Sequence, residues 1–348
     1  MKEKIKEGLK ILVFLFLSIV LLYLAFRKVD LGEVWQQIKE AEYSWILISF
    51  AFSILAFFSR ARRWILIIIP LGHKPRLWST YHALLTGYLV NFGFPRLGEI
   101  TRCVALGRKE KIAVDKLVGT VIAERAFDFL SLLIILLFML ILRNDLMASF
   151  LRNDVILPLG DKIAGIFGSA GMFFLISALV ILAVIFLLFR FRSKLAGFAF
   201  FRKISVLFKG IFNGLRAFAR IEHKLEFILH TIIIWTSYTL MTWVIVFMIP
   251  ATSGLGLVDG IFLLVTGSLA MAAPVQGGIG AFHWMVSRGL FVVYNIPLAD
   301  GLVYATLSHE SQLILIAVLG TFSIFKIFGG KKVKLRDAYQ PEAENGQN

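Results

Sequence analysis

The chain has 348 residues, of which 58% are hydrophobic and 17% are charged, and its mean hydropathy is +0.81. Soluble domains carry about 25% charged residues, so this composition excludes a soluble protein and indicates an integral membrane protein. The formal net charge of +15 does not indicate a nucleic-acid partner, because most Lys and Arg residues lie in the connections between hydrophobic segments.

The distribution of basic residues along the chain predicts its orientation in the membrane. Lys and Arg are concentrated at residues 2–10, 60–76, 108–116, 190–224 and 326–336. The polar connections at residues 27–42 and 143–162 are close to neutral. Cytoplasmic connections of membrane proteins are enriched in Lys and Arg. We therefore expect a multi-pass protein of the inner (plasma) membrane with both termini in the cytoplasm.

The first hydrophobic run, residues 9–26, is followed by Arg27 and Lys28 rather than by small residues. Because a signal peptide ends at a small-residue cleavage site, we expect an uncleaved membrane anchor here. A spanning helix needs about 20 mostly apolar residues. The segments that meet or approach this length are residues 9–26, 45–69, 123–142, 172–189, 227–249 and 301–325. These six crossings place both termini on the same side.

Three arginines, Arg60, Arg62 and Arg63, fall inside the second segment, and we expect their long side chains to extend to the cytoplasmic surface. Two amphipathic segments, residues 30–42 and 195–221, are expected to lie on the membrane surface as interfacial helices. Residues 1–336 are thus predicted to form a single transmembrane domain. The polar tail, residues 337–348, is predicted to be disordered and cytoplasmic.

Two hydrophobic regions, residues 81–106 and 258–294, are interrupted by Pro and Gly. The first lies between basic stretches, so it begins and ends on the cytoplasmic side. The second lies between nearly neutral connections, so it begins and ends outside. Pro and Gly weaken helical hydrogen bonding, and hydrocarbon supplies no water to replace it. The breaks are formed by Pro95 and Gly98 in the first region and by Pro274, Gly277, Gly278 and Gly280 in the second.

These breaks predict an all-α polytopic transmembrane helical bundle with two re-entrant or broken helical hairpins. Hairpins that enter from opposite faces are typical of an inverted repeat, in which the tips meet near the middle of the bilayer. The alternative is that each region forms two short helices that cross the membrane fully.

Ionisable residues inside membrane segments are costly and often mark functional sites. Beside the first break and in the next helix these residues are Arg96, Glu99, Arg102, Glu124, Arg125 and Asp128. Glu124 and Asp128 are four positions apart, so they share one helix face. One interpretation is a site in which arginines bind a lipid phosphate while carboxylates carry a proton or balance charge. The other is a buried ion network that holds the hairpin to the helix.

A second polar group comprises Gln276, His283, Trp284, Arg288, His309, Glu310 and Gln312. Imidazole changes its charge near physiological pH, so His283 is either a proton relay or a hydrogen-bonded structural residue. His283, His309 and Glu310 have no recognised ligand spacing, so no metal site is expected, and no cofactor either. The chain has no His-Glu-x-x-His or Gly-x-Ser-x-Gly motif.

Three motifs carry a resemblance to a known family. They are Asn91 to Arg102 with Pro95-Arg96-x-Gly98-Glu99, then Glu124-Arg125-x-x-Asp128, then Pro274 with Gly277-Gly278-x-Gly280. In these motifs, and over most of residues 9–326, the chain resembles the membrane domain of lysylphosphatidylglycerol synthetases and the stand-alone flippase-like proteins grouped with it. The resemblance implies that the chain moves a lipid between leaflets. In the fused synthetases a separate soluble domain attaches the amino acid, so we expect no enzymatic activity here.

Relatives often carry an acidic residue at the position that His283 occupies here. The resemblance therefore leaves the cargo open between an aminoacylated phospholipid and a polyprenyl-phosphate or glycolipid carrier.

We expect the chain to translocate an anionic or zwitterionic lipid whose headgroup lies between the two hairpin tips. The expected headgroup ligands are Arg96, Arg102, Arg125, Asn91 and Gln276, and the expected counter-charges or proton carriers are Glu99, Glu124, Asp128 and His283. The expected partners are the lipid, the bilayer, and either a second copy of the chain or envelope-biogenesis enzymes. The rival functions are a non-transporting scaffold for envelope glycolipid or lipid-modifying enzymes, and an intramembrane lipid-modifying enzyme that uses His283 or Glu99 as a base.

Overall fold

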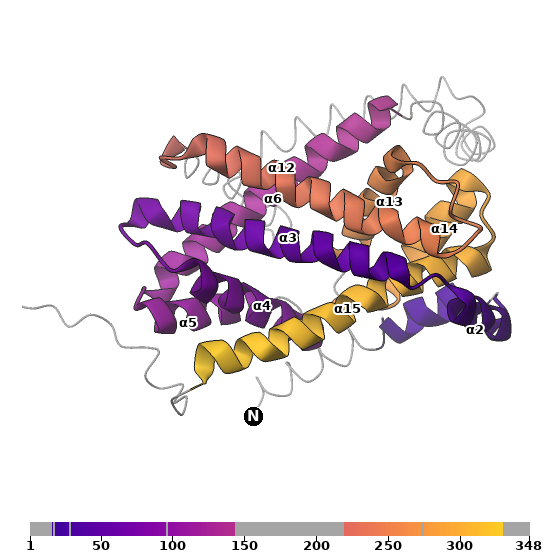
Figure 1. The fold of residues 1–348 in the computed structure, drawn as a ribbon, viewed down its shortest axis with the longest axis horizontal. Helices are drawn as coiled ribbons and strands as arrows, with labels where there is room; N and C mark the ends of the chain where they lie inside the picture. The colour runs from indigo at the N-terminus through magenta and orange to yellow at the C-terminus, as the bar shows by residue number, and fades with distance from the viewer. Residues whose placement is uncertain are drawn as a thin grey trace, which may run out of the picture.

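The computed structural model describes residues 16, 18–27, 29–94, 97–142, 219–272 and 275–329 of the chain. The elements are α2 (Leu31–Glu40), α3 (Ser44–Ile68), η1 (Ile69–Leu71), α4 (Leu77–Gly93), α5 (Leu97–Glu110), α6 (Val114–Leu142), α12 (Lys224–Trp243), η3 (Val244–Met248), α13 (Leu257–Met271), η4 (Gln276–Gly278), α14 (Ala281–Tyr294) and α15 (Leu298–Phe328). Within these described residues, three stretches are long and apolar enough to cross a membrane: Ser44–Leu71, Lys224–Met248 and Leu298–Phe328. The predicted all-α membrane bundle is confirmed (Figure 1).

Helices α3 and α12 pack against each other along their length and run antiparallel (Figure 1). Near one end, Arg62 Nε lies 2.6 Å from Glu226 Oε1, which joins the last turns of α3 to the first turn of α12. Near the other end, Ser49 Oγ donates a 2.8 Å hydrogen bond to the carbonyl of Met241, which joins the start of α3 to the end of α12. The two helices therefore point in opposite directions.

Each of these helices is followed by two short helices and then by a long one. Because α3 and α12 are antiparallel, the α4–α5 and α13–α14 hairpins start from opposite ends of the bundle (Figure 1). Helix α4 has 17 residues and α13 has 15. At 1.5 Å per residue they are about 26 and 23 Å long, less than the ~30 Å of bilayer hydrocarbon. These lengths and directions favour the inverted pair of re-entrant hairpins over two sets of full crossings.

The tips of the two hairpins touch. In the first, the Gly98 backbone N–H donates a 2.7 Å hydrogen bond to Asn91 Oδ1, and a Cβ added to Gly98 would lie only 2.6 Å from Asn91 Cγ. In the second, Gly277 and Gly280 have φ values of 58° and 84°, which glycine adopts without strain. A Cβ on Gly277 would lie 3.2 Å from a ring carbon of Phe92 in α4. The glycines of both motifs are therefore needed for close backbone packing.

Apolar packing holds each hairpin to its neighbouring long helices. One buried cluster joins α14 to α15 through residues such as Leu290 and Leu302. Another joins α3 to α5 through residues such as Trp64 and Leu106. Both clusters are close to fully buried, so the hairpins are fixed in position rather than loosely attached.

Most predicted elements that fall within the described residues are found. The three long apolar stretches correspond to the predicted segments 45–69, 227–249 and 301–325. The later part of α6 corresponds to the predicted segment 123–142, and α2 lies within the predicted interfacial segment 30–42. The start of α2 is capped by Asp30, whose carboxylate accepts a 2.7 Å hydrogen bond from the Gly32 N–H. Outside the described residues lie Pro95, Arg96, Pro274, the segment 172–189, the tail 337–348, all of residues 1–15, and most of residues 195–221.

Two arginines of α3 do not extend to the membrane surface, contrary to expectation. Arg60 is 6% exposed and Arg63 is fully buried, because carboxylates of α6 lie within reach inside the bundle. A buried partner removes the need to reach water. Arg62 does reach the surface, with its side chain 37% exposed in the pair with Glu226.

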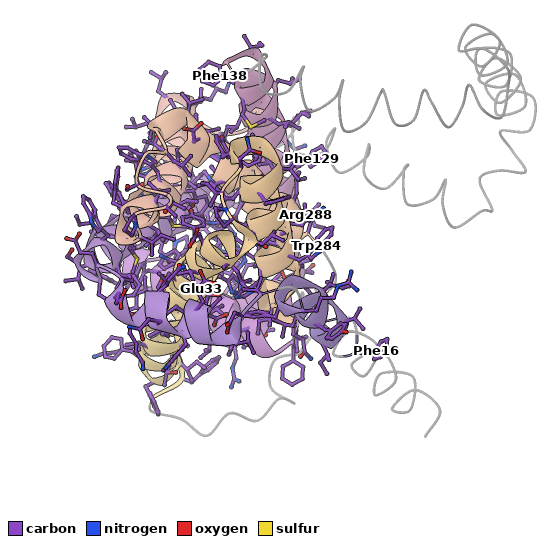
Figure 2. The ribbon with its side chains drawn as sticks, turned by 90° about the vertical axis from the view of Figure 1, so that its right-hand side faces the viewer. Phe16, Glu33, Phe129, Phe138, Trp284 and Arg288 are labelled. Carbon is purple, nitrogen blue, oxygen red and sulfur yellow. The ribbon has the colours of Figure 1, made fainter. Side chains whose placement is uncertain are left out.

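The outer surface carries aromatic rings, as a lipid-facing surface does. Phe129 and Phe138 of α6 and Trp284 of α14 are exposed, and Figure 2 shows them on one side of the molecule together with Arg288. Trp284 and Arg288 therefore face outward and do not join the polar residues inside the bundle.

Candidate functional site

Glu124 is the centre of a buried ion network. Its side chain is completely buried, and Oε1 lies 2.5 Å from Arg60 Nη2 and 3.7 Å from Arg63 Nη2. Its second oxygen lies 2.8 Å from Arg102 Nη2. The Arg102 guanidinium also lies over the Trp64 ring, 4.5 Å from its centroid. One carboxylate of α6 thus neutralises arginines from both α3 and α5 and ties the first hairpin to the bundle.

Asp128 lies one helical turn further along α6 and faces the same arginines. It is paired with Arg63, lies 3.0 Å from Arg60 Nη2, and lies 3.7 Å from Arg125 Nη1. The spacing of four residues places both carboxylates on one face, as predicted. Arg125 also reaches α5, where its Nη2 lies 3.0 Å from Glu99 Oε1.

The described part of the network is not electrically neutral. Its members are Arg60, Arg63, Arg102 and Arg125 against Glu99, Glu124 and Asp128. One positive charge is left over at neutral pH. An uncompensated charge in a membrane interior is costly, so this excess favours the binding of an anion beside the network.

A cavity of about 430 Å³ lies between the two hairpins, next to this network. Both hairpins contribute to its wall, the first through α4 and the second through α13, η4 and α14. The larger polar side chains on the wall are Arg60, Tyr88, Asn91, Arg125, Tyr238 and Gln312. Phe92 and Met271, at 40% and 49% exposure, give the cavity an apolar rim. The cavity thus has a mostly apolar wall that carries two arginines, Arg60 and Arg125, and an apolar rim.

The polar groups on the wall are held in place by further hydrogen bonds. Arg60 Nη1 lies 3.0 Å from the hydroxyl of Tyr238. Gln312 receives a 2.8 Å hydrogen bond from Ser53 and donates one of 3.0 Å to Ser49, so it is fixed to α3. The buried hydroxyl of Tyr88 has no hydrogen-bond partner among the described residues. A buried polar group without a partner is costly, which makes this hydroxyl a candidate ligand contact.

The structure brings together some of the predicted headgroup ligands and separates others. Asn91 and Arg125 line the cavity. Arg102 is 1% exposed and lies outside the cavity wall, against Trp64 and Glu124. Gln276 lies in η4 at the second tip but is not part of the wall. Arg96 lies outside the described residues.

Sequence reasoning missed Arg60, Tyr88 and Tyr238 as cavity residues. The signal for Arg60 was present, because a charged residue in the middle of an apolar segment is costly unless it has a partner. The two tyrosines gave no signal, since tyrosine is common in membrane segments.

The second polar group lies where α14 meets α15. Glu310 Oε1 lies 3.2 Å from His309 Nδ1 and 3.5 Å from His283 Nε2. His309 Nε2 lies 2.8 Å from the carbonyl of Gly277, so this histidine contacts the tip of the second hairpin. His283 is therefore one member of a three-residue cluster rather than a lone histidine.

Comparisons with known proteins identify the family. No similar protein was found among curated proteins, and none among solved structures. A family model described as the lysylphosphatidylglycerol synthase TM region matches residues 9–320, which is nearly the whole chain. Both hairpins, the ion network and the cavity fall within this match. The chain thus belongs to the family of lysylphosphatidylglycerol synthase TM regions, and is a membrane protein of a family associated with lipid modification and translocation.

Proposed function

We propose that this protein moves an anionic or zwitterionic membrane lipid between leaflets, with the headgroup in the cavity between the hairpin tips. The observation that carries the proposal is a charged cavity that both hairpins line, beside a network with one excess positive charge. A lipid phosphodiester carries one negative charge, so its entry balances the network. In this proposal the chain transports lipid and does not modify it.

Arg125 is the proposed mobile ligand of the phosphate. Its side chain is 43% exposed, lines the cavity, and is paired with Glu99, which is itself partly exposed. Exchange of this carboxylate for a phosphate costs little, because an exposed ion pair contributes only about 0–1 kcal/mol. Arg60, fixed by Glu124 and Tyr238, supplies a second charge that does not move. Arg102, Glu124 and Asp128 act as the buried support that holds Arg60 in position.

The size of the cavity separates the headgroup from the lipid tails. A volume of about 430 Å³ lies within the usual range of ~300–1,000 Å³ for ligand pockets and accommodates a headgroup. Two acyl chains do not fit beside it. The exposed rim residues Phe92 and Met271 offer an apolar exit, so the tails remain in the bilayer while the headgroup crosses.

Reconstituted vesicles provide the test. Purified protein is placed in vesicles that contain a tail-labelled fluorescent lipid, and a membrane-impermeant quencher reports the lipid that reaches the outer leaflet. The lipids to compare are phosphatidylglycerol, phosphatidylethanolamine and a polyprenyl phosphate. We expect faster movement of at least one of them than in protein-free vesicles. Protein-free rates for all three would overturn the proposal and favour the scaffold.

Arg125→Gln is expected to slow this movement by about 10- to 100-fold, because a hydrogen bond to a charged group contributes roughly 1.5–3 kcal/mol. The matched control is Arg62→Gln, which removes a half-exposed arginine from a carboxylate pair that does not line the cavity. This control should transport at the wild-type rate. Equal rates for the two variants would exclude Arg125 as a ligand.

We also propose an orientation for the chain in the inner membrane. The end of α3 faces the cytoplasm, because basic residues cluster there, and the connection after η3 faces outside. Lys74→Cys and Ser253→Cys place single thiols at exposed positions in these two connections. The native Cys103 is buried and gives no background. In intact cells, a membrane-impermeant maleimide should label Ser253→Cys, and Lys74→Cys only after permeabilisation. The opposite pattern would invert the orientation.

A further inference from the structure

His283, His309 and Glu310 form a group of potential metal ligands whose donor atoms all lie within 4.8 Å of one another. They come from two helices, α14 and α15. The two imidazoles are 3% and 6% exposed, while the Glu310 side chain is 43% exposed. The cluster is therefore buried on its histidine side and accessible on its carboxylate side.

The hydrogen bonds of His309 determine which of its nitrogens is free to bind a cation. The Gly277 carbonyl, 2.8 Å from Nε2, can only accept a hydrogen bond, so Nε2 carries a proton. In the neutral ring this leaves a lone pair on Nδ1, which faces Glu310 Oε1 at 3.2 Å. Two acceptors at this distance repel each other unless a proton or a metal cation lies between them. Histidines that bind metals commonly donate their other N–H to a carbonyl in this way.

The donor atoms of His283 and Glu310 lie close to His309 Nδ1. His283 Nε2 lies 3.5 Å from Glu310 Oε1, and its buried Nδ1 has no partner among the described residues. Ligands of a tetrahedral zinc ion lie about 3.3 Å apart, given metal–ligand distances of about 2.0–2.1 Å. The two separations from Glu310 Oε1, 3.2 and 3.5 Å, are close to this value, and all three donor atoms lie within 4.8 Å of one another.

The surrounding rings fix the orientation of the imidazoles. The Phe282 ring stacks on His309 with the centroids 4.9 Å apart, and His283 meets His309 edge-on at 5.3 Å. Fixed ligand rings lower the cost of binding, because little side-chain freedom is lost. Small movements of the exposed Glu310 then suffice to bring all three donor atoms onto one ion.

We propose that His283, His309 and Glu310 bind one divalent transition-metal ion of the Zn²⁺ class. Two imidazoles and one carboxylate are a ligand set that Zn²⁺ accepts, and three protein ligands leave a position for water or another oxygen ligand. Through the Gly277 carbonyl, the ion orders the tip of the second hairpin at the cavity wall, to which Gly277 belongs. The competing interpretation is that the three groups only share protons.

The test uses purified, tag-free, full-length protein that has been treated with a chelator and then titrated with Zn²⁺ alone by calorimetry. We expect one ion per chain. His309→Gln and Glu310→Gln should each weaken Zn²⁺ binding at least about tenfold. Loss of a residue that only supports a metal ligand already weakens binding by ~10- to 100-fold, and loss of the ligand itself should cost no less. The matched control is His230→Gln, which removes a histidine that lies beside Glu226 on α12 and outside the cluster.

Thermal unfolding separates loss of the site from loss of the fold. Zn²⁺ should raise the melting temperature of the wild type and of His230→Gln, because a ligand that binds the native state stabilises it. In His309→Gln the metal-free melting temperature should stay close to wild type while the shift with Zn²⁺ disappears. Absence of Zn²⁺ binding to the wild type, or equal affinity in His309→Gln, would overturn the proposal. Neither measurement depends on lipid transport.

Discussion

Glu124→Ala is expected to destabilise the protein strongly and to lower its folded yield. The substitution leaves Arg60, Arg63 and Arg102 buried without the carboxylate that they share. Removal of one partner from a buried ion pair costs about 3–5 kcal/mol, and whole domains are stable by only about 5–15 kcal/mol. Arg60 and Arg63 keep Asp128 as a partner, whereas Arg102 loses the one ion-pair partner that it has among the described residues. The yield of monodisperse protein in detergent and its melting temperature measure the loss.

The control for this experiment is Glu226→Ala. Glu226 also pairs with an arginine of α3, but both side chains are about one-third exposed, so the expected cost is about 0–1 kcal/mol. A second variant tests the cause directly. The double variant Glu124→Leu/Arg102→Met removes the carboxylate together with one of the arginines that it neutralises. Its folded yield should therefore be higher than that of Glu124→Ala. Wild-type stability of Glu124→Ala would show that water or lipid already compensates these arginines.

The two hairpins could be predicted because their signal is local. Pro and Gly inside an apolar segment break a helix wherever the segment lies, and hydrocarbon restricts where such a break can be placed. The contact between Phe92 and Gly277 could not be predicted in detail, since it depends on how α4 and η4 pack across the bundle. The prediction that the two hairpins enter from opposite faces came from the basic residues in the flanking connections. The exact length of each hairpin could not be predicted from these charges.

The candidate site could be predicted only in part. Glu124 and Asp128 were identified from their spacing on one helix, but their partners in α3 are more than 60 positions away. The prediction did not take into account that buried positive and negative charges must balance. Two buried carboxylates require buried cations, and Arg60 and Arg63 were two of the three arginines inside the apolar segment 45–69. The assumption that long side chains reach the surface concealed this pairing.

The histidine cluster shows a different limit. His283 and His309 have no motif spacing because they lie on two helices, and only the packing of α14 against α15 brings them together. Sequence motifs for metal sites describe ligands within one turn or loop. A site formed by tertiary packing has no such signature, so motif spacing alone does not test the expectation that the chain has no metal site.

Ser268→Trp is expected to slow lipid movement strongly while the protein remains folded. Ser268 lies on α13 at the cavity wall, and an indole there occupies space that the headgroup requires. Arg60, Arg125 and the ion network are unchanged, so the charge that attracts the lipid is still present. Movement of the best lipid in the vesicle assay should fall at least about tenfold, which corresponds to about 1.4 kcal/mol in the barrier.

The control is Leu269→Trp, which introduces the same residue at the next position of the same helix. Leu269 is 49% exposed and does not line the cavity, so its indole faces outward. We expect wild-type transport from this variant and similar melting temperatures for both, since neither indole is forced into the packed core. Transport by Ser268→Trp at the wild-type rate would show that the lipid does not pass through the cavity. In that case the excess charge of the network would have to be balanced by an ion rather than by a headgroup.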